Sequence, residues 1–239
     1  MITFNTIFYA LLGGILPAVI WLLFWLKEDS KHPESPFLIT KTFLAGMGAV
    51  ILVLPLEKII NDFFPGMSPL TFSLWALVEE GLKFAGAYFI AIHTRDDDEP
   101  IDSVIYMITV ALGFAALENA LFIASPLLNP LLQKEAIIPS AISAGGFRFI
   151  GASLLHVVSS ATIGLGFALT FYKSIKAKIF WVSFSFILSV VFHTIFNIFI
   201  FKQEGPETFL TFGAVWLAVA LLLLFFERIK ALRPNRIKL

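Results

Sequence analysis

Four apolar stretches of this sequence contain ionisable residues of the kinds that carry out acid–base chemistry or bind metal ions. LWALVEEGLKFAGAYF contains two adjacent glutamates and a lysine, and ITVALGFAALENALFI contains a glutamate followed by an asparagine. GASLLHVVSSATIGLGFA and FILSVVFHTIFNIF contain one histidine each. The polar residues concerned are Glu79, Glu80, Lys83, Glu118, Asn119, His156, Ser160, His193 and Asn197. Charge near the centre of a bilayer costs about 2.5–3.5 kcal/mol per residue, so its presence there indicates function.

The spacing of these residues places them on common helix faces. Glu79 and Lys83 are four residues apart and Glu80 and Lys83 are three apart, so both glutamates can meet the lysine. His156 and Ser160 are also four apart, and the histidine and asparagine of the last stretch repeat that spacing. Each polar face is therefore expected to point into the interior of a helix bundle.

Carboxylates and imidazoles in one buried layer permit hydrolysis by two routes. In the first, they bind zinc, which keeps a position for water and lowers the pKa of that water toward about 7. In the second, no metal is present and a buried glutamate takes a proton from water. His193 and Asn197, one helical turn apart, could then stabilise the oxyanion.

Two other functions are compatible with the same residues. Buried Glu, Lys and His side chains also form the proton relays of proton- or ion-coupled transporters, although the sequence has no repeat pair with matched broken helices. Alternatively, the polar groups only hold the helices together, a role that suits Ser159, Ser160 and Ser189. Adjacent glutamates argue against that role, because hydrogen bonding alone does not require charge.

The elements that must position these residues are transmembrane helices. Seven stretches reach the length of about 20 mostly apolar residues that a span requires. They are 4–26, 38–57, 69–92, 101–124, 147–172, 178–200 and 207–226, and Pro55 makes the second the least regular. The chain is 58% hydrophobic and only 14% charged, against about 25% charged for a soluble domain. We predict an all-α, polytopic bundle that forms one domain over residues 1–239, with the catalytic helices at about 69–200.

The positive charges predict an orientation. With the N-terminus outside, the outer side holds Lys58, Lys134, Arg148 and Lys202 of the 17 Lys and Arg residues. Lys83 lies within a span and the remaining twelve fall on the cytoplasmic side, together with the C-terminus. At 1.5 Å per residue, Glu79 and Glu80 then lie roughly 15 Å below the outer end of their span, and Glu118 roughly 9 Å.

Composition also bounds the partners. The chain has no cysteine, which excludes disulfides, thiolate nucleophiles and thiolate metal sites. Its net charge is zero and gives no information about nucleic acid, and no nucleic-acid partner is expected. The expected surroundings are the lipid bilayer of a prokaryotic inner or plasma membrane, and the sequence does not indicate an oligomeric state.

Taken in order, the patterns EExxK, FxxxEN, HxxxS and HxxxN resemble the PrsW family of intramembrane proteases, which is distantly similar to the CAAX-processing endopeptidases. The resemblance covers roughly residues 20–200. It implies an endopeptidase that cuts membrane-anchored protein substrates, anti-sigma factors being the type that named the family. The depth of the polar layer places such cleavage near the outer membrane face.

The resemblance also implies roles for individual residues. Glu79 is the preferred base and Glu80 the second choice. Glu118, His156 and His193 are the preferred ligands of a zinc ion, or activating groups in the metal-free mechanism that has been argued for the CAAX relatives. Asn197 is expected to donate to the oxyanion, and the expected supporting residues are Lys83, Asn119 and Ser160.

Overall fold

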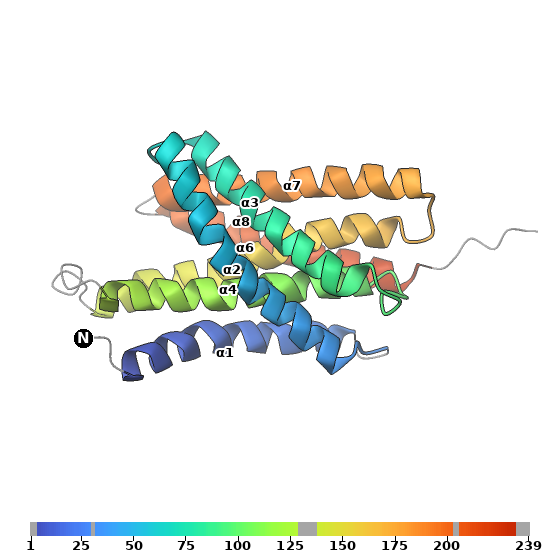
Figure 1. Cartoon of the computed structure of the whole chain (residues 1–239), viewed down its shortest axis with the longest axis horizontal. Helices are drawn as coiled ribbons and strands as arrows, with labels where there is room; N and C mark the ends of the chain where they lie inside the picture. The colour runs from blue at the N-terminus through green and yellow to red at the C-terminus, as the bar shows by residue number, and fades with distance from the viewer. Residues whose placement is uncertain (1–3, 30–31, 129–137, 203–205, 233–239) are drawn as a thin grey trace, which may run out of the picture.

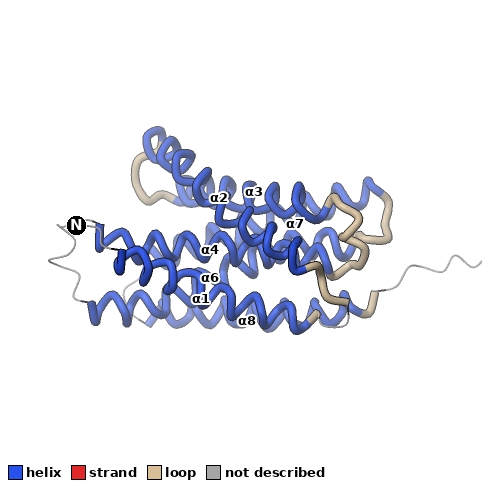
Figure 2. The backbone as a smooth tube through the Cα atoms, turned by 60° about the horizontal axis from the view of Figure 1, so that its bottom comes forward, coloured by secondary structure: helices blue, strands red, loops and turns tan. Residues whose placement is uncertain are grey.

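The computed structural model describes residues 4–29, 32–128, 138–202 and 206–232, and these form helices and short connections without a strand (Figure 2). The helices are α1 (Phe4–Glu28), α2 (Pro36–Phe63), α3 (Pro69–Ala87), α4 (Asp102–Leu128), α6 (Ile138–Leu169), α7 (Ile175–Lys202) and α8 (Pro206–Lys230). A short π-helix, η1 (Tyr88–Ile92), continues α3. The all-α bundle expected from the sequence is therefore confirmed.

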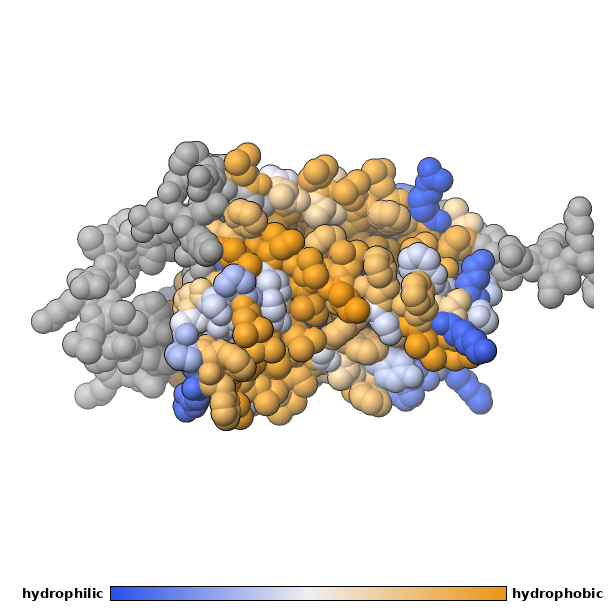
Figure 3. Space-filling model, turned by 90° about the horizontal axis from the view of Figure 1, so that it is seen from above, coloured by the Kyte–Doolittle hydropathy of each residue, from blue (hydrophilic) through white to orange (hydrophobic). Residues whose placement is uncertain are grey.

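The surface of the bundle is that of a multi-pass membrane protein. Figure 3 shows hydrophobic residues over the middle of the visible face and hydrophilic residues near its ends. Within the described residues, five helices are long and apolar enough to cross a membrane. These are Ile7–Glu28, Pro36–Phe63, Asp102–Ala124, Gly151–Leu169 and Ile175–Phe199. The third helix differs from them because it carries Glu79, Glu80 and Lys83 within its 19 residues.

Several helices extend beyond their predicted ends, α2 and α6 by the most. α2 passes through Pro55 and ends at Phe63, whereas the sequence placed its end at 57. A proline removes one backbone hydrogen bond, and transmembrane helices tolerate that loss through local adjustment. α6 begins at Ile138 instead of 147. Pro139 falls in its first turn, where a missing N–H leaves no helical bond unmade.

The start of α3 is fixed by local sequence. The Ser68 side chain caps the helix by accepting a hydrogen bond from the backbone N–H of Thr71 at 3.1 Å. Pro69 follows at the first helical position, where its fixed φ favours helix initiation. This cap fixes the start of the helix that carries Glu79, Glu80 and Lys83.

α4 is the central helix of the bundle. Every residue from 101 to 116 is buried, and the helix contacts α1, α2 and α6. Its approach to α2 depends on glycine. A Cβ atom on Gly113 would lie 1.9 Å from the backbone oxygen of Phe43, and one on Gly46 would lie 2.0 Å from that of Val110. The two backbones are therefore in direct contact, as in small-residue interfaces between transmembrane helices.

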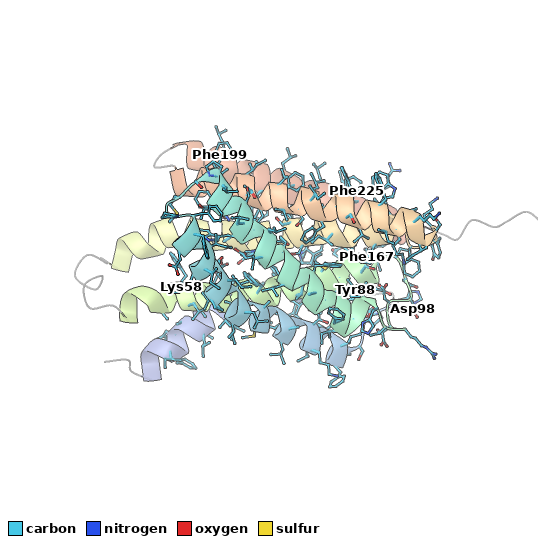
Figure 4. All side chains as sticks on the ribbon, turned by 45° about the horizontal axis from the view of Figure 1, so that its top comes forward. Lys58, Tyr88, Asp98, Phe167, Phe199 and Phe225 are labelled. Atoms are coloured by element: carbon cyan, nitrogen blue, oxygen red, sulfur yellow. The ribbon has the colours of Figure 1, made fainter. Side chains whose placement is uncertain are left out.

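The bundle has two distinct ends (Figure 1). The α2–α3 turn lies at one end, and the α1–α2, α3–α4 and α6–α7 connections lie at the other. Figure 4 shows Lys58 toward the first end and Asp98 in the α3–α4 connection at the second. For clarity, the two are called the α2–α3 end and the α3–α4 end below.

Candidate active site

A buried lysine joins three of the polar residues expected in the interior. The Lys83 side chain has no exposed surface, and its Nζ donates to Glu80 Oε1 at 2.7 Å. The same ammonium donates to His156 Nδ1 at 2.8 Å and lies 3.5 Å from Glu79 Oε2. The ring of Phe114 lies beneath it, with its centroid 4.3 Å from Nζ. The ammonium is thus the electrostatic centre of a cluster built from α3, α4, α6 and α7.

Glu80 has hydrogen-bond partners on both carboxylate oxygens. Oε1 accepts from Lys83 and from His193 Nδ1, the latter at 2.9 Å. Oε2 accepts from the hydroxyls of Ser160 at 2.8 Å and Ser189 at 3.3 Å. A carboxylate has about four lone-pair sites, so this fully buried group has no acceptor capacity left for a water molecule.

Glu79, one residue earlier, has a different environment. It is 5% exposed, and its Oε2 is buried without a hydrogen-bond partner in the described part of the chain. Besides the Lys83 ammonium, His193 Nε2 lies 3.7 Å and His156 Nδ1 3.9 Å from that oxygen. Glu79 therefore offers a buried acceptor that faces two imidazoles and can bind an internal water molecule or a cation.

Each histidine has one ring nitrogen held by a carboxylate. His193 Nδ1 donates to Glu80, which leaves Nε2 facing Glu79. His156 Nε2 lies 2.8 Å from Glu118 Oε2, and Nδ1 accepts from Lys83 because an ammonium has no lone pair. Carboxylates bound to the outer nitrogen of histidine are common at metal sites, where they fix the tautomer and the ring orientation.

The donor set fits a zinc ion. Glu79, His156 and His193 each offer one ligand atom, and these atoms lie within 4.8 Å of one another. Two imidazoles and one carboxylate form a donor set known from zinc hydrolases. The unpartnered oxygen of Glu79 supports this fit. The Lys83 ammonium donates to both His156 Nδ1 and Glu80 Oε1. If His156 Nδ1 binds the metal ion, Lys83 must give up its bond to that nitrogen and keep only the bond to Glu80.

Glu118 was expected to be a metal ligand. Its carboxylate instead contacts His156 Nε2, the ring nitrogen that faces away from Glu79. Its side chain is 42% exposed, whereas those of Glu79, Lys83, His156 and His193 are at most 6% exposed. Glu118 thus joins the buried cluster to the surface.

The remaining predicted residues are divided between the cluster and its surroundings. Ser160 belongs to the cluster through Glu80. Asn119 donates instead to the hydroxyl of Ser153 at 3.0 Å, a bond that joins α4 to α6. Asn197 is partly buried one turn beyond His193, and within the described residues it forms no hydrogen bond to the cluster.

Glu57 is a member of the site that the sequence analysis missed. The predicted second span ended at this residue, whereas α2 continues to Phe63 and includes Glu57 within the helix. Its carboxyl group interacts electrostatically with those of Glu79 and Glu118. The available signal was the apolar pair Ile59 and Ile60, which shows that the helical pattern continues beyond Pro55.

The fold and the cluster define a polytopic membrane protein with an acid–base site inside its helix bundle. A family model described as PrsW family intramembrane metalloprotease matches residues 34–225. Because this match spans most of the chain, the protein belongs to the PrsW family.

Individual relatives agree with this assignment. A Protease PrsW from Clostridioides difficile is 32% identical over 126 residues, which cover 50% of this chain and 52% of that relative. Another from Halalkalibacterium halodurans is 26% identical over 195 residues, covering 80% of this chain and 82% of the relative. A third from Geobacillus kaustophilus is 24% identical, with 80% of each chain covered. No solved structure matches the chain.

Proposed function

We propose that this protein is an intramembrane endopeptidase that hydrolyses a peptide bond in membrane-anchored proteins of a prokaryotic cell membrane. The observation that carries the proposal is Glu79 Oε2, a buried acceptor with no hydrogen-bond partner in the described residues, beside two carboxylate-oriented histidines. A general base must have a free acceptor within reach of water, and Glu79 has one while Glu80 does not.

In the proposed reaction, Glu79 takes a proton from a water molecule held near His193 Nε2. The water oxygen attacks the carbonyl carbon, and the proton then passes to the nitrogen of the leaving amine. The Lys83 ammonium, 3.5 Å from Glu79 Oε2, stabilises the negative charge that develops on the carbonyl oxygen. Asn197 is proposed as a further donor to that oxygen, because its amide is not engaged by the cluster.

The same residues serve a metal-dependent route. If the site binds zinc, we propose Glu79, His156 and His193 as the ligands, and the ion supplies a water of lowered pKa and a polarised carbonyl group. Glu80 and Glu118 then act from outside, by holding the outer nitrogens of the two histidines.

The proposed substrates are single-span proteins of the anti-sigma-factor type. Glu79 lies ten residues into α3, counted from its start at Pro69, which is a depth of roughly 15 Å at 1.5 Å per residue. The α2–α3 end is the one that the positive-inside rule predicts to lie outside. Cleavage is therefore proposed in the outer half of the membrane.

The test is a Glu79→Gln variant, co-expressed with a single-span membrane protein tagged at both ends. Cleavage, followed by immunoblotting of both tags, should fall by at least about 100-fold, because the amide cannot accept a proton. Asp62→Asn is the matched control, since it makes the same chemical change at an exposed position of α2. Undiminished cleavage by Glu79→Gln would refute the proposal.

A further inference from the structure

Three carboxylates meet at the α3–α4 end of the bundle, away from the Glu79 cluster. Asp29 follows α1, Glu34 precedes α2, and Asp102 begins α4. Each offers one oxygen, and the three oxygens lie within 4.8 Å of one another. Asp29 and Asp102 are buried and Glu34 is partly buried. Three carboxylates at this separation repel one another unless positive charge or protons lie between them.

Two of the three carboxylates are held in place by donors. Glu34 Oε2 accepts a hydrogen bond from the hydroxyl of Tyr106, a residue of α4 with no exposed surface. Asp102 Oδ2 accepts from the backbone N–H groups of Asp98 at 2.9 Å and Glu99 at 2.6 Å. These bonds fix the positions of the two carboxylates.

Asp29 is the member without such a donor. It is 6% exposed, and its Oδ2 is buried with no hydrogen-bond partner in the described part of the chain. A buried carboxylate oxygen that makes no hydrogen bond is costly. The orphaned oxygen is a second observation, independent of the clustering, and it indicates a ligand.

The charged groups around Asp29 are mostly negative. The carboxylates of Glu34 and Glu99 face it, and burial together with these charges raises the pKa of Asp29 to about 6. The nearby cations also have partners of their own. His32 lies 3.6 Å from Glu99, and Lys230 lies 2.8 Å from Glu227. The acidic run 96–99 adds further negative charge to this end.

We propose that Asp29, Glu34 and Asp102 bind a hard divalent cation, Mg²⁺ or Ca²⁺. All three ligands are carboxylate oxygens, which these cations prefer, and the group contains no nitrogen or sulfur donor of the kind that favours zinc. The ion ties the end of α1 and the α1–α2 connection to the first turn of α4. Since α4 is the central helix and carries Glu118, the cation stabilises the helix bundle around the active site.

Terbium(III) tests the site directly in the purified full-length protein. Tyr106 donates to Glu34 and therefore lies close enough to sensitise Tb³⁺ emission at the site. The titration is made in the Glu79→Gln variant, because this substitution removes one ligand of the other candidate metal site and so limits Tb³⁺ binding there. Tb³⁺ emission should saturate, and Ca²⁺ or Mg²⁺ should compete with it; whichever competes at lower concentration identifies the preferred ion. Asp29→Asn and Glu34→Gln should each weaken binding at least tenfold, whereas Glu227→Gln, an exposed carboxylate at the same end, should not.

Thermal unfolding gives a second readout that separates binding from folding. Without divalent cations, Asp29→Asn should raise Tm, because the amide removes a buried like charge. With saturating Mg²⁺ or Ca²⁺, the parent protein should gain Tm and the variant should gain little. The proposal is overturned if Tb³⁺ emission does not saturate, if both amide variants bind as tightly as the parent, or if neither cation changes Tm.

Discussion

At the scale of single residues, the adjacent Glu79 and Glu80 show how environment assigns different roles to identical side chains. Both are buried on α3, and both lie near Lys83. Glu80 has four hydrogen-bond partners, including Ser189 and His193 on α7, whereas Glu79 Oε2 has none among the described residues. One carboxylate therefore holds the cluster together and the other is available for chemistry.

The bond between Lys83 and Glu80 yields a prediction about stability. Lys83→Met or Glu80→Gln alone should each destabilise the protein by about 3–5 kcal/mol, because each leaves a buried charge without its partner. The double variant should lose clearly less than the sum of the two, since both charges are gone. Thermal unfolding of the purified variants measures these changes.

The exposed pair of Lys58 and Asp62 provides the control for this experiment. Its atoms are 3.1 Å apart, but the side chains are 77% and 63% exposed. Lys58→Met should therefore cost less than about 1 kcal/mol. Additive losses in the double variant of Lys83 and Glu80 would mean that the two charges are stabilised independently.

Sequence spacing predicted which residues of the site share a helix face, but it did not predict which side chains bond to one another. Helical intervals of three and four residues correctly grouped Glu79, Glu80 and Lys83 on one face. Which glutamate is saturated depends on side chains from α6 and α7 that lie 80 to 113 residues away. Sequence spacing carries no information on such contacts. Asn119 shows the same limit. Asn119 donates to Ser153, whereas its sequence neighbour Glu118 contacts His156.

At the scale of helices, the prediction was accurate for their number and less accurate for their ends. Apolar length identified the helical segments because a bilayer requires about 20 such residues. The ends of α2 and α6 were misplaced at prolines, which the structure accommodates inside one helix and in the first turn of the other. The predicted end of the second span at Glu57 left this residue at the helix boundary, and it was omitted from the site.

The contact between α2 and α4 yields a prediction at this scale. Gly46→Val should lower the free energy of unfolding by at least about 1–3 kcal/mol, because its Cβ would lie 2.0 Å from a backbone oxygen that cannot move aside. Cleavage should fall as well, since α4 carries Glu118 and α2 carries Glu57. Thermal unfolding and the cleavage assay measure the two effects.

Gly48, on the same helix, is the control for that substitution. A Cβ at Gly48 would meet nothing within 4 Å. Gly48→Val should therefore leave both Tm and cleavage close to those of the parent. Equal effects at the two positions would show that the loss comes from helix propensity and not from the interhelical contact.

At the scale of the whole molecule, the two ends of the bundle carry different chemistry. Glu79 lies ten residues from the start of α3 at the α2–α3 end, and the Asp29 cluster lies at the α3–α4 end, where α1 ends and α4 begins. Of the 17 Lys and Arg residues, Lys58 lies toward the first end (Figure 4). At the second end, Lys27 is in the last turn of α1, and Arg95 and Lys173 are in the α3–α4 and α6–α7 connections. The positive-inside rule therefore predicts that the α3–α4 end lies in the cytoplasm and the proposed peptidase site in the outer half of the membrane.

The absence of cysteine from the chain makes this orientation directly measurable. Met67→Cys introduces a thiol into the α2–α3 turn, where the native side chain is 59% exposed. Ser174→Cys does the same in the exposed α6–α7 connection. A membrane-impermeant maleimide should label the first variant in intact cells and the second only after permeabilisation. The reverse pattern would invert the topology, move the Glu79 cluster to the inner half of the membrane, and expose the Asp29 cluster to extracellular cations instead of cytoplasmic ones.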